Sequence, residues 1–143
     1  GMVGGQMIDL ASENIKSDTN LISRLEIMKT GALIAFSCEA GATIAGASAE
    51  ERKTLRKFGF ELGLAFQIID DLLDVEGDEM VLGKSVGKDA VAGKATFVSI
   101  LGADGARREA LALVNRATER LRPFEMAADP LHDFCDYLLT RQS

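Results

Sequence analysis

Residues 48–75 read SAEERKTLRKFGFELGLAFQIIDDLLDV, and this stretch decides the fold. Ser48 and Glu51 have the three-residue spacing of a capping box, in which each side chain bonds the backbone of the other residue at a helix start. Apolar side chains then recur at helical spacing, and β-branched residues do not cluster. The stretch therefore predicts one long helix that ends near Val75.

The rest of the chain has the same helical periodicity, interrupted by capping residues, glycines and two prolines. Asp104 and Asp129 are suitable helix caps, Pro123 stops a helix, and Pro130 suits a first helical turn. The glycine-punctuated residues 77–93 predict a loop. We expect an all-α fold in a single domain over residues 1–143, with further helices at about 3–11, from 17–20 to 47, 96–101, 104–121 and 129–140.

Composition excludes several classes of protein. A chain of 143 residues with 47% hydrophobic residues is long enough to bury a core, and its formal net charge of -6 argues against nucleic-acid binding. Two distant cysteines and a single histidine argue against a disulfide scaffold, a zinc site or a His-based triad. We expect Cys38 and Cys135 to be buried free thiols. No membrane span is expected, because Glu39 interrupts the least charged stretch.

Asp70, Asp71 and Asp74 form an acidic stripe on the otherwise apolar helix. At about 100° per residue they fall within an arc of about 100°, and Gln67 projects into the same arc. A solvated face is the ordinary explanation for such a stripe. However, Asp is a poor helix former, like charges one turn apart repel, and no Lys or Arg between Phe58 and Glu76 could compensate.

A hard cation between the carboxylates removes this difficulty. Mg²⁺ suits the spacing, because it keeps several waters and shares its coordination shell with substrate phosphates. A calcium loop does not fit, since glycine is missing from the sixth position counted from Asp70 or from Asp74. The stripe therefore predicts a magnesium site, with the solvated face as the alternative.

Basic residues elsewhere complement the stripe. Lys29 lies in the most apolar sector of the preceding helix, so it either extends its ammonium out of the core or points into a polar cavity. The hydroxyl of Thr30 and the glycine that follows suit a cavity wall. Lys84 and Lys94 lie in the glycine-rich loop, which is one residue too long for a nucleotide P-loop and does not follow a strand. These lysines could instead close over an anion.

A diphosphate could be bound from one side by Mg²⁺ on the carboxylates and from the other by the lysine ammonium groups. Both would stabilise the negative charge that develops on a leaving group. Departure of diphosphate from an allylic carbon leaves a carbocation. The dipoles of Thr30 and Gln67 could shelter such a cation in an apolar cavity.

Several motifs, in this order, resemble those of the trans-isoprenyl diphosphate synthases, most closely the bacterial farnesyl diphosphate synthases (geranyltranstransferases). They are Gly4-Gly5-Gln6-x-x-Asp9, Lys29-Thr30-Gly31-Ala32-Leu33, Phe66-Gln67-x-x-Asp70-Asp71-x-x-Asp74, Gly83-Lys84 and Gly93-Lys94. The resemblance implies the isoprenoid synthase fold, with antiparallel helices around a central cavity. It also implies condensation of isopentenyl diphosphate with an allylic diphosphate, dimethylallyl or geranyl diphosphate, to give farnesyl diphosphate.

The resemblance assigns roles to the residues that match the motifs. Asp70, Asp71 and Asp74 would be the second aspartate-rich motif and would bind Mg²⁺ directly or through water. Lys29, Thr30 and Gln67 would contact the allylic diphosphate or the nascent cation and would be catalytic. The substrate-binding residues would be these three together with Lys84 and Lys94. A homodimer is expected from the same resemblance, and the two free thiols indicate a reducing cytoplasm.

Members of that family are about twice as long, and their first aspartate-rich motif has no counterpart in this sequence. The chain therefore resembles the C-terminal half of such an enzyme and is expected to be inactive alone. Two alternatives are a non-catalytic helical interaction module and a terpene cyclase. The intact motifs argue against the first, and the Lys-Thr-Gly and loop-lysine motifs favour a synthase over the second.

Overall fold

The computed structural model describes residues 3, 7, 30–82 and 96–141, and within these residues the regular structure is entirely helical. The elements are α3 (Ala32–Ile44), α4 (Ala49–Leu82), α5 (Phe97–Leu121), the 3-10 segment η2 (Arg122–Ala128) and α6 (Asp129–Thr140). This confirms the predicted fold class. Most of the helix predicted at 3–11, and the part of the next predicted helix before residue 30, lie outside the described residues, as do Gln6, Asp9, Lys29 and the loop with Lys84 and Lys94.

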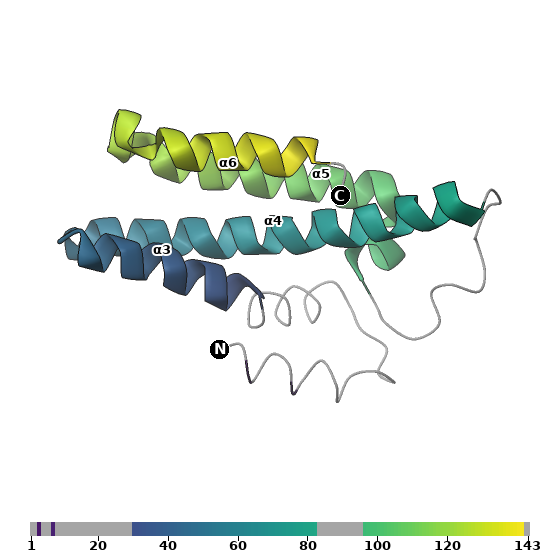
Figure 1. Cartoon of the computed structure of the whole chain (residues 1–143), viewed down its shortest axis with the longest axis horizontal. Coiled ribbons are helices and arrows are strands. Elements are labelled where there is room, and N and C mark those ends of the chain that lie inside the picture. The colour runs from purple at the N-terminus through teal and green to yellow at the C-terminus, as the bar shows by residue number, and fades with distance from the viewer. Residues whose placement is uncertain (1–2, 4–6, 8–29, 83–95, 142–143) are drawn as a thin grey trace.

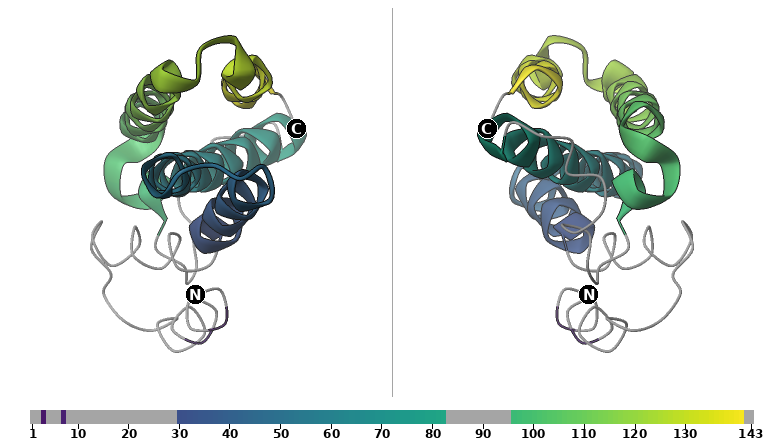
Figure 2. Two further views of the ribbon diagram at one scale, coloured as in Figure 1. Left: turned by 90° about the vertical axis from the view of Figure 1, so that its left-hand side faces the viewer. Right: turned by 90° about the vertical axis from the view of Figure 1, so that its right-hand side faces the viewer.

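Helix α4 lies in the middle of the molecule. Figure 1 shows α3 along one side of it and α5 and α6 along the other, and the end-on views in Figure 2 show the same three layers. Contacts between α4 and each of α3, α5 and α6 agree with this arrangement. The position of a residue around α4 therefore decides whether its side chain faces α3, the layer of α5 and α6, or the surface.

Local sequence accounts for the start of α4. The backbone N–H of Ser48 donates to Glu51 Oε2 at 2.7 Å, and the N–H of Glu51 donates to Ser48 Oγ at 3.3 Å, so the predicted capping box is confirmed. Before it, α3 ends at Ile44 rather than near residue 47, because Gly46 turns the chain with a φ of 74°.

The predicted end of α4 near Val75 is wrong, because the helix continues through Gly77 to Leu82. Glu76 in this extension forms an ion pair with Arg107 of α5. This tertiary contact joins residues 31 positions apart, so local periodicity could not reveal it. The predicted loop consequently begins later than residue 77.

The two helices predicted at 96–101 and 104–121 are joined in α5, with a break at Gly102 (φ 69°, ψ 165°). Thr96, rather than Asp104, caps the element through a capping box with Ser99. Pro123 follows the end of α5 at Leu121, as predicted. The predicted cap of α6 was one residue off, since Ala128 is the cap and Asp129 lies in the first turn. Its acidic side chain still favours the positive end of the helix dipole.

Large apolar side chains fill the contact between α4 and the layer of α5 and α6. We call this contact the apolar interface; it includes the buried residues Phe58, Leu62, Ala65, Ile68 and Leu72 of α4, Phe97, Leu113 and Leu121 of α5, and Cys135 and Leu138 of α6. Burial raises the pKa of the Cys135 thiol, which is fully buried as predicted. Cys38 is only partly buried, which corrects its prediction.

Small residues fill the contact between α3 and α4, which we call the glycine interface (Gly31, Ala35, Gly59 and Gly63). A side-chain carbon added at Gly59 would lie 2.5 Å from the Cα atom of Ala35, and one at Gly63 would lie 2.6 Å from the Cα atom of Gly31. Neither position has room for a methyl group. The two backbones therefore approach closely, and residues at the start of α3 come within reach of polar groups on α4.

Candidate functional site

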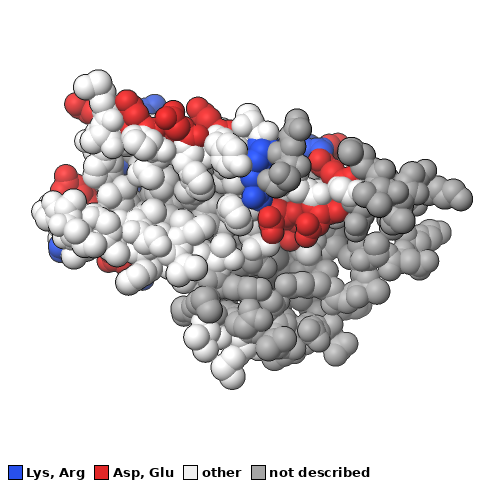
Figure 3. Space-filling model, in the orientation of Figure 1, with Lys and Arg blue, Asp and Glu red and all other residues white. Residues whose placement is uncertain are grey.

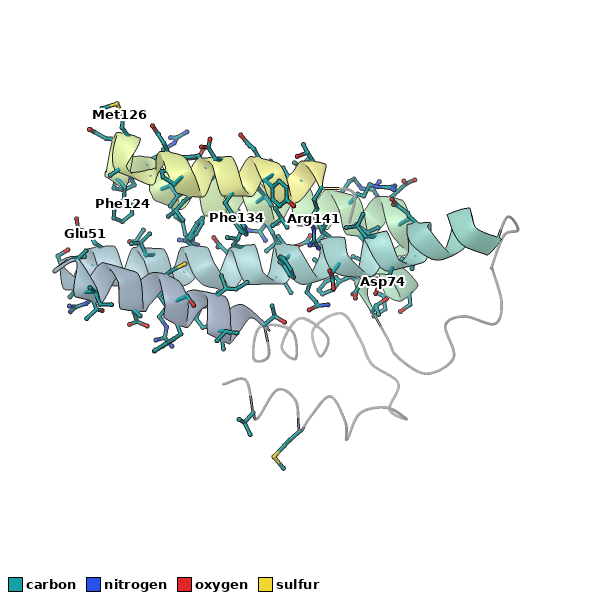
Figure 4. The ribbon with its side chains drawn as sticks, viewed as in Figure 1. Glu51, Asp74, Phe124, Met126, Phe134 and Arg141 are labelled. Carbon is teal, nitrogen blue, oxygen red and sulfur yellow. The ribbon has the colours of Figure 1, made fainter. Side chains whose placement is uncertain are left out.

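The predicted acidic stripe lies in the second half of α4. The side chain of Asp70 is 48% exposed, Asp71 is partly buried, and Asp74 is exposed. Figures 3 and 4 share one orientation, and acidic atoms lie beside basic atoms in the region where Asp74 and Arg141 are labelled. Asp70 and Asp71 thus combine partial exposure with protein partners, and Asp74 is open to solvent.

A short hydrogen-bonded chain links Asp71 to the start of α3. Thr30 Oγ1 donates to Gln67 Oε1 at 3.2 Å, and Gln67 Nε2 donates to Asp71 Oδ1 at a longer 3.5 Å. The glycine interface makes the first bond possible, because Gly63 lies against Gly31, the neighbour of Thr30. Three residues predicted for the site are therefore brought together.

Asp70 has a different partner, which the sequence did not suggest. Arg141 Nη2 donates to Asp70 Oδ1 at 3.0 Å, and the guanidinium carbon lies 4.5 Å from the centre of the Phe66 ring. Arg141 immediately follows α6, and its side chain is only 11% exposed. An arginine after a helix end is common because it favours the negative end of the helix dipole, so its type and position gave no signal.

The aspartates do not form a closed protein cage for a metal. Within the described part of the chain, no group of three or more His, Cys, Asp or Glu side chains could hold an ion by itself. The donor set nevertheless fits Mg²⁺, which is typically held by one or two carboxylates while waters and phosphate oxygens complete the shell. Lys29, Lys84 and Lys94 lie outside the described residues, so their place in the site stays a prediction.

Comparison with known proteins identifies the family and agrees with the fold. Residues 1–128 match the family model described as polyprenyl synthetase. The chain belongs to the polyprenyl synthetase family. It is 42% identical to geranylgeranyl diphosphate synthase of Cyanophora paradoxa over 145 residues, which cover 100% of this chain and 48% of that protein.

Two solved structures of the polyprenyl synthetase family are similar to this chain. An FPP/GFPP synthase from Zymomonas mobilis is 44% identical with a TM-score of 0.81, and the match covers 96% of this chain and 45% of that one. A geranyltransferase from Helicobacter pylori, complexed with magnesium and isoprenyl diphosphate, is 33% identical with a TM-score of 0.75 and covers 97% and 46%. The chain thus spans about half the length of the relatives it matches, and the all-α isoprenoid synthase fold is confirmed.

No described helix is both long and apolar enough to cross a membrane.

Proposed function

We propose that the chain forms the C-terminal half of a prenyltransferase site that condenses isopentenyl diphosphate with an allylic diphosphate. The observation that carries the proposal is the second half of α4, where three aspartates share one helix face and Gln67 links one of them to Thr30. Family membership supplies the reaction class.

In this proposal Asp70, Asp71 and Asp74 hold Mg²⁺ through carboxylate oxygens or through bound water. When bound, the metal neutralises charge on the diphosphate leaving group. A relative from Helicobacter pylori was crystallised with magnesium and isoprenyl diphosphate, which supports this choice of ion.

In this proposal Thr30 and Gln67 stabilise the allylic cation that remains when the diphosphate leaves. The hydroxyl oxygen of Thr30 and the carbonyl oxygen of Gln67 lie 3.2 Å apart and offer the negative ends of two dipoles. Their bond fixes both groups before substrate arrives, so little reorganisation accompanies formation of an allylic cation. Lys29, Lys84 and Lys94 would complete the grip on the diphosphate as positively charged groups.

Farnesyl diphosphate is the proposed product, with dimethylallyl or geranyl diphosphate as the allylic substrate. The relatives carry names that include geranylgeranyl diphosphate synthase and FPP/GFPP synthase, so the family supports the reaction more directly than the product length. Incubating the chain with isopentenyl and geranyl diphosphates should give no product, because the matched relatives are about twice as long. A C15 product would overturn that expectation.

We also propose a homodimer and a cytoplasmic location. Leu33, Phe36 and Ile44 of α3 are 55%, 66% and 88% exposed, and exposed apolar residues grouped on one helix favour association. Light scattering after size-exclusion chromatography should give twice the mass of the chain. A monomer at micromolar concentration would contradict the homodimer.

Calorimetry with geranyl diphosphate tests the site. In MgCl₂ the chain should bind the ligand, and replacing the metal with EDTA should abolish binding. Asp74→Asn should weaken binding about tenfold, equivalent to about 1.4 kcal/mol, because it removes one of the negatively charged metal ligands. Asp133→Asn removes an exposed carboxylate of α6 and serves as the matched control. Absence of Mg²⁺-dependent binding would instead favour a non-catalytic helical module.

A further inference from the structure

Arg120 and Arg141 each pair with a carboxylate of α4, and these two pairs differ in geometry. Arg120 of α5 uses both Nε and Nη2, which donate to Glu61 Oε2 at 2.6 Å and to Glu61 Oε1 at 2.5 Å. Both carboxylate oxygens are occupied, and the Glu61 side chain is 18% exposed. This two-point geometry is typical of a pair that joins two helices.

Arg141 holds Asp70 at one point. Only Nη2 of the guanidinium donates to Asp70, through Oδ1, and Nε is buried without a hydrogen-bond partner among the described residues. The exposure is also reversed, since the arginine side chain is 11% exposed and the Asp70 side chain is 48% exposed. The cation is thus the buried partner, and the carboxylate keeps about half of its surface accessible.

Arg141 also has contacts that do not depend on Asp70. The backbone N–H of Arg141 donates to the carbonyl oxygen of Tyr137 at 2.9 Å, which ties the residue to the last turn of α6. The guanidinium also packs over the ring of Phe66, one helical turn before Asp70 on α4. A cation fixed by backbone and ring can orient a carboxylate while occupying one of its oxygens.

We propose that Arg141 is a positioning residue that orients Asp70 for Mg²⁺ binding. A carboxylate has about four acceptor sites, so a single bond at Oδ1 leaves sites for a metal or a metal-bound water. Partners that orient metal ligands in this way typically contribute about 10–100-fold to metal affinity. This inference rests on the proposed magnesium site, and it adds the residue that follows α6 to a site otherwise built on α4 and on Thr30, just before α3.

A substitution at Arg141 can distinguish an orienting role from the effect of its positive charge. If Arg141 acted only through its positive charge, Arg141→Lys would leave Mg²⁺ binding unchanged. If it acts by orientation, the lysine variant loses the planar donor and the packing on Phe66, and Asp70 is no longer held. We therefore expect Arg141→Lys to raise about tenfold the Mg²⁺ concentration that half-saturates geranyl diphosphate binding. Phe66→Leu, which leaves both charges in place, should shift it in the same direction by less.

The experiment is a Mg²⁺ titration of geranyl diphosphate binding to the 143-residue chain, followed by calorimetry, with urea unfolding of each variant alongside. Arg120→Lys is the control, because it should lower stability without moving the Mg²⁺ half-saturation point. In the Asp70→Asn background, Arg141→Lys should cause no further shift, whereas in the Asp74→Asn background the shift should persist.

The outcomes distinguish this inference from the proposed function. A wild-type chain that shows no Mg²⁺-dependent binding removes the magnesium site and the positioning role together. A wild-type chain that binds normally, with an unchanged Mg²⁺ dependence in Arg141→Lys, overturns the positioning role alone. A shift of equal size in the Asp70→Asn background overturns it as well, since Arg141 would then act through another group.

Discussion

Helix α4 packs against α3 through small residues and against α5 and α6 through large ones. At the glycine interface the backbones approach so closely that positions 59 and 63 have no room for a methyl group. At the apolar interface the fully buried side chains of Phe58, Ile68 and Leu121 fill the space instead. The two interfaces therefore have different roles. The apolar interface supplies most of the stability, and the glycine interface brings Thr30 close to Gln67.

The largest effect is expected at the apolar interface. Phe58→Ala should lower the free energy of unfolding by about 3–5 kcal/mol, because it removes a fully buried ring and leaves a cavity. Urea denaturation measures the change. Tyr137→Ala is the matched control, because the Tyr137 side chain is 60% exposed and its loss should cost less than about 1 kcal/mol. Equal losses of unfolding free energy in the two variants would contradict the stabilising role of the apolar interface.

The next effect separates the interfaces directly. Gly63→Ala should destabilise the chain by about 1–3 kcal/mol, because the new methyl group meets the backbone of Gly31, which cannot move aside as a side chain could. Gly41→Ala on α3 meets nothing within 4 Å and should raise stability by about 0.5–1 kcal/mol through helix propensity. Thermal unfolding of both variants measures the difference in stability between them. The Gly63→Ala loss should disappear only if α3 can shift away from α4, which would contradict a tight glycine interface.

A smaller effect is expected at the pair of Glu61 and Arg120, which crosses from α4 to α5. Glu61→Gln should cost about 1 kcal/mol, the upper end for partly exposed pairs, because the bidentate geometry is favourable. Glu50→Gln disrupts a 3.8 Å contact with Lys53 on a solvated surface and should cost about 0.3 kcal/mol. Raising the salt concentration should reduce both differences; a salt-independent loss would argue against an ionic contribution.

The smallest effect lies in the capping box where α3 turns into α4. Hydrogen bonds from the Ser48 side chain and backbone lower the pKa of Glu51. A lowered folded-state pKa means that this stabilisation is present above the unfolded pKa and is lost as the pH falls through the folded pKa. Ser48→Ala should therefore raise the Glu51 pKa toward its ordinary value, as followed by NMR titration of the carboxyl carbon. An unchanged pKa would show that the box does not persist in solution.

Much of the fold follows from local sequence signals. The capping box of Ser48 and Glu51, the stop before Pro123 and the end of α6 at Thr140 were all predictable, because each depends on residues a few positions apart. The extension of α4 past Gly77 was not predictable, since Glu76 pairs with a residue on another helix.

The candidate site divides in the same way. Helical spacing placed Gln67 near Asp71, and the structure agrees. The pairing of Asp70 with Arg141 joins residues 71 positions apart, and the sequence offers no motif for it. Two adjacent carboxylates of one helix can thus have partners in different layers, which only the packing of three layers reveals.

The break in α5 has a consequence for engineering this chain. Gly102 has no atom within 4 Å of the position that a methyl group would occupy, so a filter based on space alone would accept alanine there. Its φ of 69° and ψ of 165° fall in a region that is essentially restricted to glycine. A stabilised variant should therefore keep Gly102, because the residue is required for its backbone torsion angles and not for lack of space around it.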